Sequence, residues 1–365
     1  MEYSSAKYEL ISCVNCGSPP EEHEHFIGSK VAHHGHMYGD PLEIVVCSKC
    51  GLVFLNPQPT REALDQFYRE EYYQETPLYS DIDALKSTKI WQRDFLFTWL
   101  VEHIPEGIND WDILDIGSGF GVWLQWFDSS NRLSGIDSSK QASKVAQELF
   151  GINAYQMDFL TNDLKDGQFD LITGLAIIEH FNDPLEALIE LNRLLKTGGY
   201  LYLQTPDIHG LVLRQGISRY FKVVHTFYFS ILTLSSLLTK SGFDIIATRR
   251  RSCLVETSGI LYPNNYWSGE LDLLAIKRSS QSLDDAKSRP AEGNDLDAAV
   301  SSLRSALKRD RFYINYAKLY RLAGIRILFK GLFKIADLIK LPKSIFEVQA
   351  ELLGLKFREP TGKAD

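Results

Sequence analysis

The chain has 365 residues, of which 44% are hydrophobic, so it is long enough to bury one sizeable core with further segments attached. Its formal net charge of -8 argues against a general nucleic-acid binder, and we expect no nucleic-acid partner. The first residues, MEYSSAKYEL, do not read as a signal peptide, and no apolar run reaches the roughly eighteen residues of a membrane span, so we expect a cytoplasmic protein.

Four of the five cysteines form two Cys-x-x-Cys pairs, Cys13/Cys16 and Cys47/Cys50. In a reducing compartment such pairs indicate metal binding rather than disulfides. A glycine follows each pair, which lets the backbone fold tightly and aim N–H groups at the sulfurs. Four thiolates make a closed tetrahedral site, so residues 1–60 are predicted to be a zinc-ribbon module with a structural zinc. Five nearby histidines could replace a cysteine ligand or contact a substrate, although such residues more often lie on the surface: His23, His25, His33, His34 and His36.

Residues 61–110 are predicted to be a helical connector, because two helix-like patterns follow the proline-rich exit NPQPT. From residue 111 to 278, short apolar runs alternate with helical patterns, which predicts βαβ units and a mainly parallel sheet. The last two strand candidates lie close together in the sequence, which suits an antiparallel edge. The seven candidates are Asp112 to Ile116, Leu133 to Ile136, Ala154 to Met157, Asp170 to Thr173, Tyr200 to Gln204, Phe243 to Thr248 and Leu271 to Ile276.

A glycine-rich turn follows the first of these strands, in WDILDIGSGFGVWLQWF, and a helix-like stretch comes after it. Gly117, Gly119 and Gly121 have the spacing G-x-G-x-G, not the G-x-G-x-x-G of the nicotinamide and flavin fingerprint. Asp115 precedes them, whereas a pyrophosphate favours helix-end N–H groups without a nearby anion. A carboxylate there suits a cationic ligand without phosphate, such as S-adenosylmethionine. The alternative is an ordinary glycine-rich turn.

This motif, D-x-G-x-G-x-G, resembles the first motif of class I S-adenosylmethionine-dependent methyltransferases, and FDLITGLAIIEHFNDP and LLKTGGYLYLQTPD resemble later segments of that family. The resemblance covers residues 111–278 and implies an α/β fold with a Rossmann-like seven-stranded methyltransferase sheet. It further implies that Asp137 accepts the ribose hydroxyls, that Asp158 accepts from the adenine amino group, and that Phe159 flanks the adenine ring. The alternatives are a helix N-cap for Asp137 and a simple loop carboxylate for Asp158.

The order of zinc ribbon, GLVFLNPQPT, FYREEYY and methyltransferase domain resembles the zinc-binding methyltransferases of sugar and cell-surface polysaccharide pathways. The chain departs from them in lacking their additional C-terminal α/β domain. It also has KVVHTFYFS where they have Tyr-x-Glu-His, so that Lys222 and Val224 replace Tyr and Glu while His225 is retained. These differences put sugar C-methylation in doubt and leave methyl transfer itself as the expectation.

Two histidines are candidates for the base that removes a proton from a hydroxyl acceptor, because imidazole titrates near neutral pH. His180 follows the fourth strand candidate, where acceptor pockets of this class open, and His225 precedes a segment that usually covers the pocket. A hydrogen-bonded structural histidine is the alternative for each. Four tyrosines could line the acceptor side, although each is more readily explained by packing: Tyr72, Tyr73, Tyr220 and Tyr228.

These features predict an S-adenosylmethionine-dependent methyltransferase with a small acceptor, either a saccharide or a nucleotide-linked sugar. A quinone-like or other small-molecule O-methyltransferase is the alternative within enzymes, suggested by IIEH-x-x-D-P. A non-catalytic scaffold or binding protein with the same fold is the alternative of another class. The intact set of acidic and glycine positions argues against that scaffold.

Beyond the sheet, residues 279–296 are polar and are predicted to be a flexible linker. Residues 297–365 are predicted to form a basic amphipathic helical tail. In RLAGIRILFKGLFKIADLIKLPKSIF the polar residues recur every three or four positions beside a broad apolar face. Such a helix either packs on protein, including a second copy of the chain, or lies in a membrane interface. The tail is therefore expected to serve either peripheral membrane contact or self-association.

Overall fold

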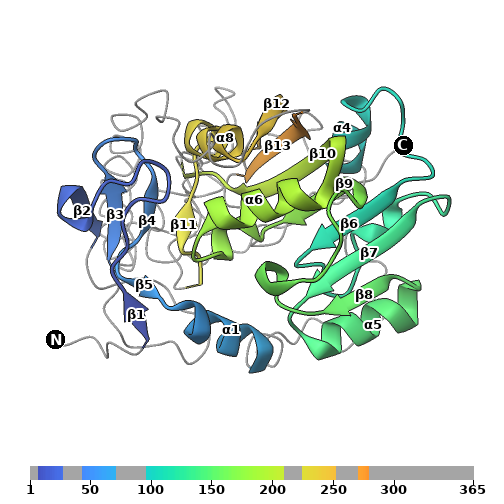
Figure 1. Cartoon of the computed structure of the whole chain (residues 1–365), viewed down its shortest axis with the longest axis horizontal. Helices are drawn as coiled ribbons and strands as arrows, with labels where there is room; N and C mark the ends of the chain where they lie inside the picture. The colour runs from blue at the N-terminus through green and yellow to red at the C-terminus, as the bar shows by residue number, and fades with distance from the viewer. Residues whose placement is uncertain (1–6, 28–42, 71–95, 209–223, 252–269, 279–365) are drawn as a thin grey trace, which may run out of the picture.

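The computed structural model describes residues 7–27, 43–70, 96–208, 224–251 and 270–278. Within these residues the strands form a seven-stranded, a four-stranded and a two-stranded sheet. Figure 1 shows the seven-stranded sheet with its helices on one side of the molecule and the four-stranded sheet on the other. The predicted linker 279–296 and tail 297–365 lie outside the described residues, so the predictions for them remain predictions.

The large sheet has the strand order β12-β13-β10-β9-β6-β7-β8. Strands β8, β7, β6, β9 and β10 run parallel, whereas β13 is antiparallel to both β10 and β12. The predicted α/β fold with a mainly parallel sheet and an antiparallel edge is therefore confirmed. The strands are β6 (Asp112–Ile116), β7 (Arg132–Asp137), β8 (Asn153–Gln156), β9 (Phe169–Leu175), β10 (Leu195–Pro206), β12 (Phe243–Arg251) and β13 (Glu270–Lys277).

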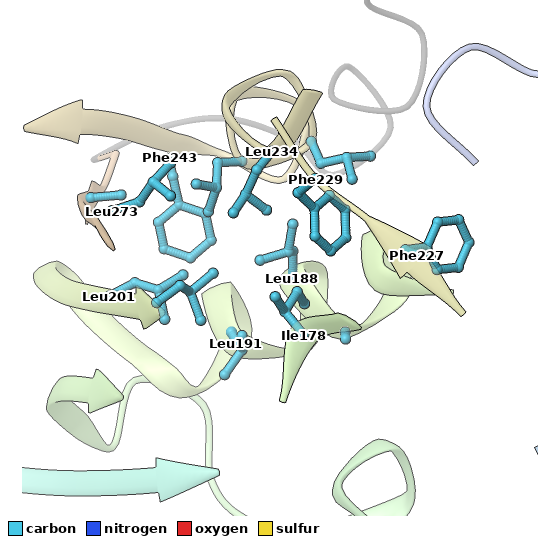
Figure 2. Packing of buried hydrophobic residues seen from close by; sticks show 14 of the residues in the cluster. Ile178, Leu188, Leu191, Leu201, Phe227, Phe229, Leu234, Phe243 and Leu273 are labelled. Carbon is cyan, nitrogen blue, oxygen red and sulfur yellow. The ribbon is translucent and has the colours of Figure 1, made fainter. Parts of the chain in front are cut away.

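Helices cover both faces of this sheet. One face packs on α4 (Thr98–Glu102), the short helix η4 (Leu124–Trp126) and α5 (Lys140–Phe150), through a cluster that includes Trp99, Trp123 and Ala146. The other face packs on α6 (Pro184–Leu194) and α8 (Ile231–Lys240). Figure 2 shows Leu188 and Leu191 of α6 and Leu234 of α8 meeting Leu201 and Leu273 of the sheet. Alternation along each strand thus sends apolar side chains into two cores, as expected for a parallel sheet buried on both faces.

Local sequence explains where these helices begin and end. The Asp183 carboxylate accepts from the backbone N–H groups of Leu185 and Glu186, and Pro184 occupies the first turn of α6, where no N–H is needed. Ser139 caps α5 in the same way, and Gly151 ends it with a φ of 64°. The glycine turn is followed only by the one-turn helix η4, so the helix-like stretch expected there is shorter than predicted. The ring of Trp123 packs edge-on against those of Trp126 and Phe127, at centroid distances of 5.2 and 5.7 Å, and a single tight turn permits this.

The smaller sheet has the order β11-β4-β3-β2 and contains three N-terminal strands: β2 (His23–Ile27), β3 (Ile44–Cys47) and β4 (Val53–Leu55). Its fourth strand, β11 (Phe227–Tyr228), comes from the segment that follows β10. Nearby lie η1 (Pro20–Glu22) and the pair of β1 (Tyr8–Glu9) with β5 (Gln58–Pro59). The N-terminal part is therefore joined by main-chain pairing to the segment that follows β10.

The connector begins with helix α1 (Arg61–Glu70), which lies between the two sheets in Figure 1. Residues 71–95 of the connector lie outside the described residues. None of the helices in the described part of the chain is long and apolar enough to cross a membrane.

Candidate functional site

The carboxyl ends of the parallel strands meet at one edge of the large sheet. The chain leaves β6 toward β7 and β8 on one side and returns to β9 and β10 on the other, so the strand order reverses next to β6. Ligands of open α/β sheets bind in the crevice at such a reversal. The predicted cofactor residues lie at or just after the ends of β6, β7 and β8; His180 follows β9, and His225 comes later in the chain, just before β11 (Phe227–Tyr228).

The glycine turn after β6 requires its glycines. Gly117, Gly119 and Gly121 have φ values of 63°, 52° and 76°, in the left-handed region that side chains disfavour. A Cβ atom at Gly117 would also lie 2.7 Å from Cδ1 of Ile177, in the loop after β9. In that loop Ala176 has a φ of 53° and donates its N–H to the Gln204 carbonyl at 2.8 Å. Two tight backbone segments thus face each other where the strand order reverses.

Asp115, on β6, is a buried carboxylate beneath this turn. Its Oδ1 accepts from the Thr173 hydroxyl at 2.6 Å, and the Thr173 oxygen in turn accepts from Nε1 of Trp123 at 3.1 Å. Burial raises the pKa of Asp115 to about 7, the hydrogen bond from Thr173 opposes this rise, and the charge of Asp137 adds to it. The strand end therefore holds a carboxylate whose ionised form is poorly solvated and would be stabilised by a nearby cation.

The pH dependence of stability should reveal this group. Because the pKa of Asp115 is raised on folding, the folded state binds the extra proton, and its stabilising contribution is lost as the pH rises from about 4 to 7. Asp115→Asn, which keeps an oxygen for Thr173, should lack this loss and exceed the wild-type free energy of unfolding by roughly 2–4 kcal/mol at pH 8. Urea denaturation at pH 5 and pH 8 measures the difference. Equal pH slopes for the two proteins would contradict the assignment.

Asp137, at the end of β7, is buried and its carboxylate is held by two backbone groups. Gly119 donates its N–H to Oδ2 at 2.9 Å, and Ser139 donates its N–H to Oδ1 at 2.8 Å. The N-cap of α5 is Ser139, so Asp137 is not itself the helix cap that was the alternative to a ribose contact. The carboxylate is thus fixed against the glycine turn, and its role toward a ribose stays a prediction.

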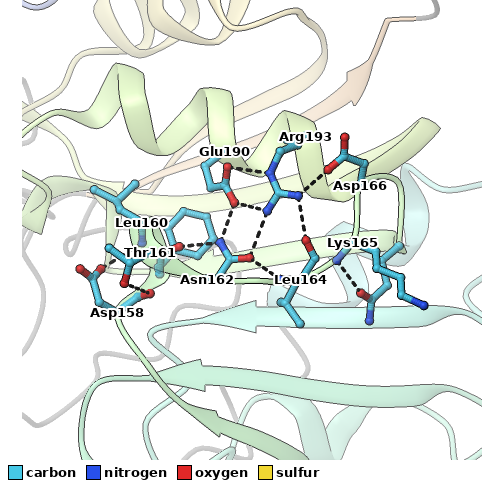
Figure 3. A network of polar contacts seen from close by, with 11 residues as sticks. Asp158, Leu160, Thr161, Asn162, Leu164, Lys165, Asp166, Glu190 and Arg193 are labelled. Carbon is cyan, nitrogen blue, oxygen red and sulfur yellow. Dashed lines mark hydrogen bonds and ion pairs between the residues drawn. The ribbon is translucent and has the colours of Figure 1, made fainter.

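Asp158 caps a short helix and forms an ion pair with the connector. Its Oδ1 accepts from the Leu160 N–H at 2.9 Å, at the start of η5 (Phe159–Thr161). Its Oδ2 lies 2.8 Å from Nη2 of Arg61 in α1. Figure 3 shows Asp158 at the end of a polar network that continues through Asn162 to Arg193 of α6. Since both oxygens bind protein donors, the adenine contact predicted for Asp158 remains a prediction.

Phe159 is buried, and its ring meets that of Phe181 at 5.8 Å between centroids, tilted by 60°. Phe181 lies in the loop after β9, so the two aromatic rings join the loops that follow β8 and β9. The structure thus explains Phe159 as packing between these loops, and the predicted contact with an adenine ring is not tested by it.

The two histidines chosen as candidate bases lie together. The rings of His180 and His225 are 4.6 Å apart between centroids and nearly perpendicular, at 84°. His180 ends η6 (Ile178–His180), and its Nε2 is 3.9 Å from Oε1 of the buried Glu179. The Thr205 hydroxyl, near the end of β10, donates to Oε2 of Glu179 at 2.9 Å. This Glu179–His180–His225 cluster brings one carboxylate and two imidazoles within 4.8 Å of one another, and Glu179 is a member that the sequence did not single out.

Tyr68 of α1 is a second member that the sequence did not single out. Its hydroxyl is hydrogen-bonded to Nδ1 of His180, and the two rings meet edge-on at 5.7 Å. Tyr68 lies seven positions after Arg61, so one face of α1 touches both Asp158 and His180. Of the predicted aromatic lining, only Tyr228 is described; it is buried, with its ring 6.2 Å from that of His225. Tyr72, Tyr73 and Tyr220 lie outside the described residues.

The backbone around His225 is fixed by the N-terminal sheet. Leu55 of β4 donates its N–H to the Thr226 carbonyl at 2.9 Å, and Phe227 pairs with Phe54. The Thr226 N–H donates to the Glu179 carbonyl at 2.9 Å. His225 is thereby held between η6 and the smaller sheet.

The four predicted metal ligands also converge. Cys13 and Cys50 have their sulfurs 3.5 Å apart, those of Cys16 and Cys47 are 3.4 Å apart, and all four sulfurs lie within 4.8 Å of one another. A tetrahedral zinc with Zn–S bonds of about 2.3 Å needs sulfurs about 3.8 Å apart, so the geometry fits zinc. After each pair the glycine N–H donates back to the first cysteine carbonyl, in the tight turn that the glycines predict.

Neither of the nearby histidines in the described residues, His23 and His25, belongs to the group of four cysteines. His23 is buried, with Nε2 3.0 Å from the Ser18 carbonyl and Nδ1 3.2 Å from Nδ2 of Asn56. His25 is paired with Glu43. His33, His34 and His36 lie outside the described residues.

Comparison with known proteins agrees with this architecture. Residues 85–248, somewhat less than half of the chain, match a family model described as a methyltransferase domain. The tRNA U34 carboxymethyltransferase of Cellvibrio japonicus is 29% identical over 168 residues, covering 42% of this chain and 51% of that protein. The ubiquinone biosynthesis O-methyltransferase of Thiobacillus denitrificans is 30% identical over 100 residues, covering 26% and 43%. The chain spans about half the length or less of these relatives.

Among solved structures, an S-adenosylmethionine-dependent methyltransferase from Mesorhizobium loti aligns with 47% of this chain and 92% of its own. Its sequence identity is 18% and its TM-score is 0.38.

Proposed function

We propose that the whole protein transfers a methyl group from S-adenosylmethionine to a hydroxyl of a small acceptor. The premise is that the chain carries an S-adenosylmethionine-dependent methyltransferase domain. The observation that carries this proposal is the Glu179–His180–His225 cluster, which joins the loop after β9 to the segment before β11. The loop after β9 also meets the glycine turn after β6, through Ile177 and Gly117. A site for a methyl donor and a group that accepts a proton then share one edge of the sheet.

The donor would be held by the residues predicted for it. Buried carboxylates at the ends of β6 and β7, Asp115 and Asp137, suit a ligand that has cationic and hydroxyl groups and no phosphate. The donor supplies an electrophilic methyl group on a sulfonium, with a neutral thioether as the leaving group. The residues contributed by this chain fix the donor, align the acceptor and exclude water.

The proton of the acceptor hydroxyl would pass to the histidine pair. His180 has Nδ1 engaged by Tyr68 and Nε2 directed toward Glu179, an arrangement that suits a positioning group. We therefore assign the base to His225 and the support of its orientation to His180. Glu179 would stabilise the positive charge that develops on the pair.

The acceptor we propose is a saccharide or a nucleotide-linked sugar. The cluster is polar, lies beside the aromatic side chains of Tyr68 and Tyr228, and is bounded by the N-terminal sheet, all of which suit a polyhydroxylated ligand. The likeness to a ubiquinone biosynthesis O-methyltransferase supports a quinone-like hydroxyl as the second candidate.

The proposal is tested by incubating the full chain with labelled S-adenosylmethionine and separate panels of nucleotide sugars, glycans and quinols. A tRNA arm is included because relatives include tRNA enzymes, so the expected absence of a nucleic-acid partner is itself only a prediction. Label in a sugar supports the main proposal, and label in a quinol supports the second. Label confined to tRNA would overturn both.

Loss of the Asp137 carboxylate should weaken cofactor binding. For Asp137→Ala we expect S-adenosylmethionine affinity to fall by about 1–3 kcal/mol, the scale for leaving buried donors unsatisfied. Because Asp137 also holds the Gly119 N–H, calorimetry should compare S-adenosylhomocysteine with its 2′-deoxyribose analogue. A ribose contact predicts that the variant no longer distinguishes the two ligands. Full discrimination in a folded variant would assign Asp137 to the turn alone.

For the four-cysteine cluster we propose a structural zinc. Cys13, Cys16, Cys47 and Cys50 would all be ligands, which leaves no open position for substrate. Its role would be to hold β3 and β4, and through them the strand next to His225.

A further inference from the structure

A buried lysine of the methyltransferase domain reaches the N-terminal cysteine cluster. Lys240 ends α8, is 4% exposed, and donates from Nζ to the carbonyl of Asn15, which lies between Cys13 and Cys16. One helical turn earlier, Ser236 donates to Oδ1 of Asn15 at 2.9 Å. Two side chains of α8 therefore hold the first Cys-x-x-Cys turn.

The buried ammonium of Lys240 requires a nearby negative charge. A buried ammonium is costly unless it is paired, and a backbone carbonyl supplies only a dipole. Burial lowers the pKa of Lys240, and the thiolate charges of Cys16, Cys50 and Cys13 oppose that change. Lys49, by contrast, is more than half exposed and is already paired with Glu22 at 2.7 Å.

We infer that Lys240 is the countercharge of the metal–thiolate centre, so that a helix of the methyltransferase domain completes the N-terminal metal site. A zinc ion with four thiolates keeps a net negative charge, and an ammonium beside it in a poorly solvated region stabilises the deprotonated, metal-bound state. The exposed Lys49 contributes less because water and salt screen it. This inference rests on the proposed zinc and makes Lys240 a positioning residue, not a ligand.

Lys277 offers a matched control. It is a half-buried lysine of β13 that donates from Nζ to the Leu195 carbonyl at 2.7 Å. Burial lowers its pKa as well, but the opposing charge is that of Asp166 and not a thiolate. Replacing Lys240 or Lys277 removes a buried or half-buried ammonium that donates to a backbone carbonyl. Only the replacement of Lys240 also changes the charge beside the cysteines.

The test is zinc affinity, measured by competition with a chelator on the full chain. Lys240→Gln keeps a hydrogen-bond donor for Asn15 and removes the charge; Lys240→Met removes both. Both should weaken zinc binding about 10–100-fold, the usual effect of outer-shell changes, whereas Lys277→Gln should stay within about twofold of wild type. The thermal stabilisation gained on adding zinc should shrink in parallel in the Lys240 variants.

Wild-type zinc affinity in Lys240→Gln would overturn the inference, even if Lys240→Met binds weakly, because a hydrogen bond would then explain the contact. Equal weakening by the Lys240 and Lys277 variants would overturn it too, since general destabilisation would suffice. A wild-type chain that binds no zinc would instead refute the metal proposal itself.

Discussion

Replacement of His225 by alanine is expected to lower turnover about 10²–10⁴-fold and to leave S-adenosylmethionine affinity nearly unchanged. The reason is geometric: His225 lies just before β11, next to His180, whereas the residues proposed to hold the donor lie at or just after the ends of β6, β7 and β8. Single-turnover methyl transfer and calorimetry measure the two quantities separately. The next residue, Thr226, is fixed by backbone hydrogen bonds to Leu55 and Glu179, which the replacement of a neighbouring side chain leaves in place, so the variant should fold.

The comparison variants decide which imidazole acts. His180→Ala should reduce turnover less than His225→Ala, since we assign it a supporting role. His103→Ala serves as the control, because Nδ1 of His103 bonds the Trp99 carbonyl at the end of α4, away from the cluster. A large loss confined to His180→Ala would reverse the two roles. Full activity in both cluster variants would show that the reaction needs no histidine base.

Serine replacement of Cys47 should have the second large effect, because it should abolish metal binding. We expect about one equivalent of zinc in the wild-type protein, purified without a histidine tag, and substoichiometric zinc in Cys47→Ser. Methyl transfer should fall with it, since Cys47 ends β3, β3 pairs with β4, and β4 pairs with β11 next to His225. Metal analysis and a transfer assay on the same preparations check both results.

Ser48→Ala is the matched control in the same turn. Ser48 is exposed and donates only to the Glu22 carbonyl, so its loss should leave zinc content and transfer close to wild type. A wild-type protein that is free of metal and yet fully folded would refute the zinc proposal. Loss of zinc without loss of methyl transfer would support the zinc proposal but refute the proposed link between the zinc site and His225.

The sequence predicted the features that depend on local pattern. Apolar runs alternating with helical patterns located all seven strands of the large sheet to within five residues at each end, because strands buried on both faces are rich in apolar residues. The spacing of Cys13, Cys16, Cys47 and Cys50 identified the cluster because each Cys-x-x-Cys pair forms a tight turn, which is a local feature of the sequence.

The contacts that join distant segments could not be predicted in this way. Neither the pair of Arg61 with Asp158 nor that of Tyr68 with His180 leaves a periodic signal, because each depends on where α1 docks. In the sequence, Lys240 is an ordinary basic residue at the end of an amphipathic helix. Its role depends on the first cysteine turn, which contacts it only in the folded chain. Strand β11 has only two residues, too few for any alternation.

That short strand has a consequence for how the protein is made. The edge of β4 is paired by Phe227 and Tyr228, and Tyr228 is added to the chain 173 positions after Leu55. At ordinary rates of synthesis the interval is roughly 10–35 s, during which VFL presents an open apolar edge to other nascent chains. Early zinc capture by the first fifty residues would shorten the lifetime of the fully unstructured N-terminus but would not close that edge. Efficient production should therefore depend on chaperones that shield nascent chains more than on the stability of the finished fold.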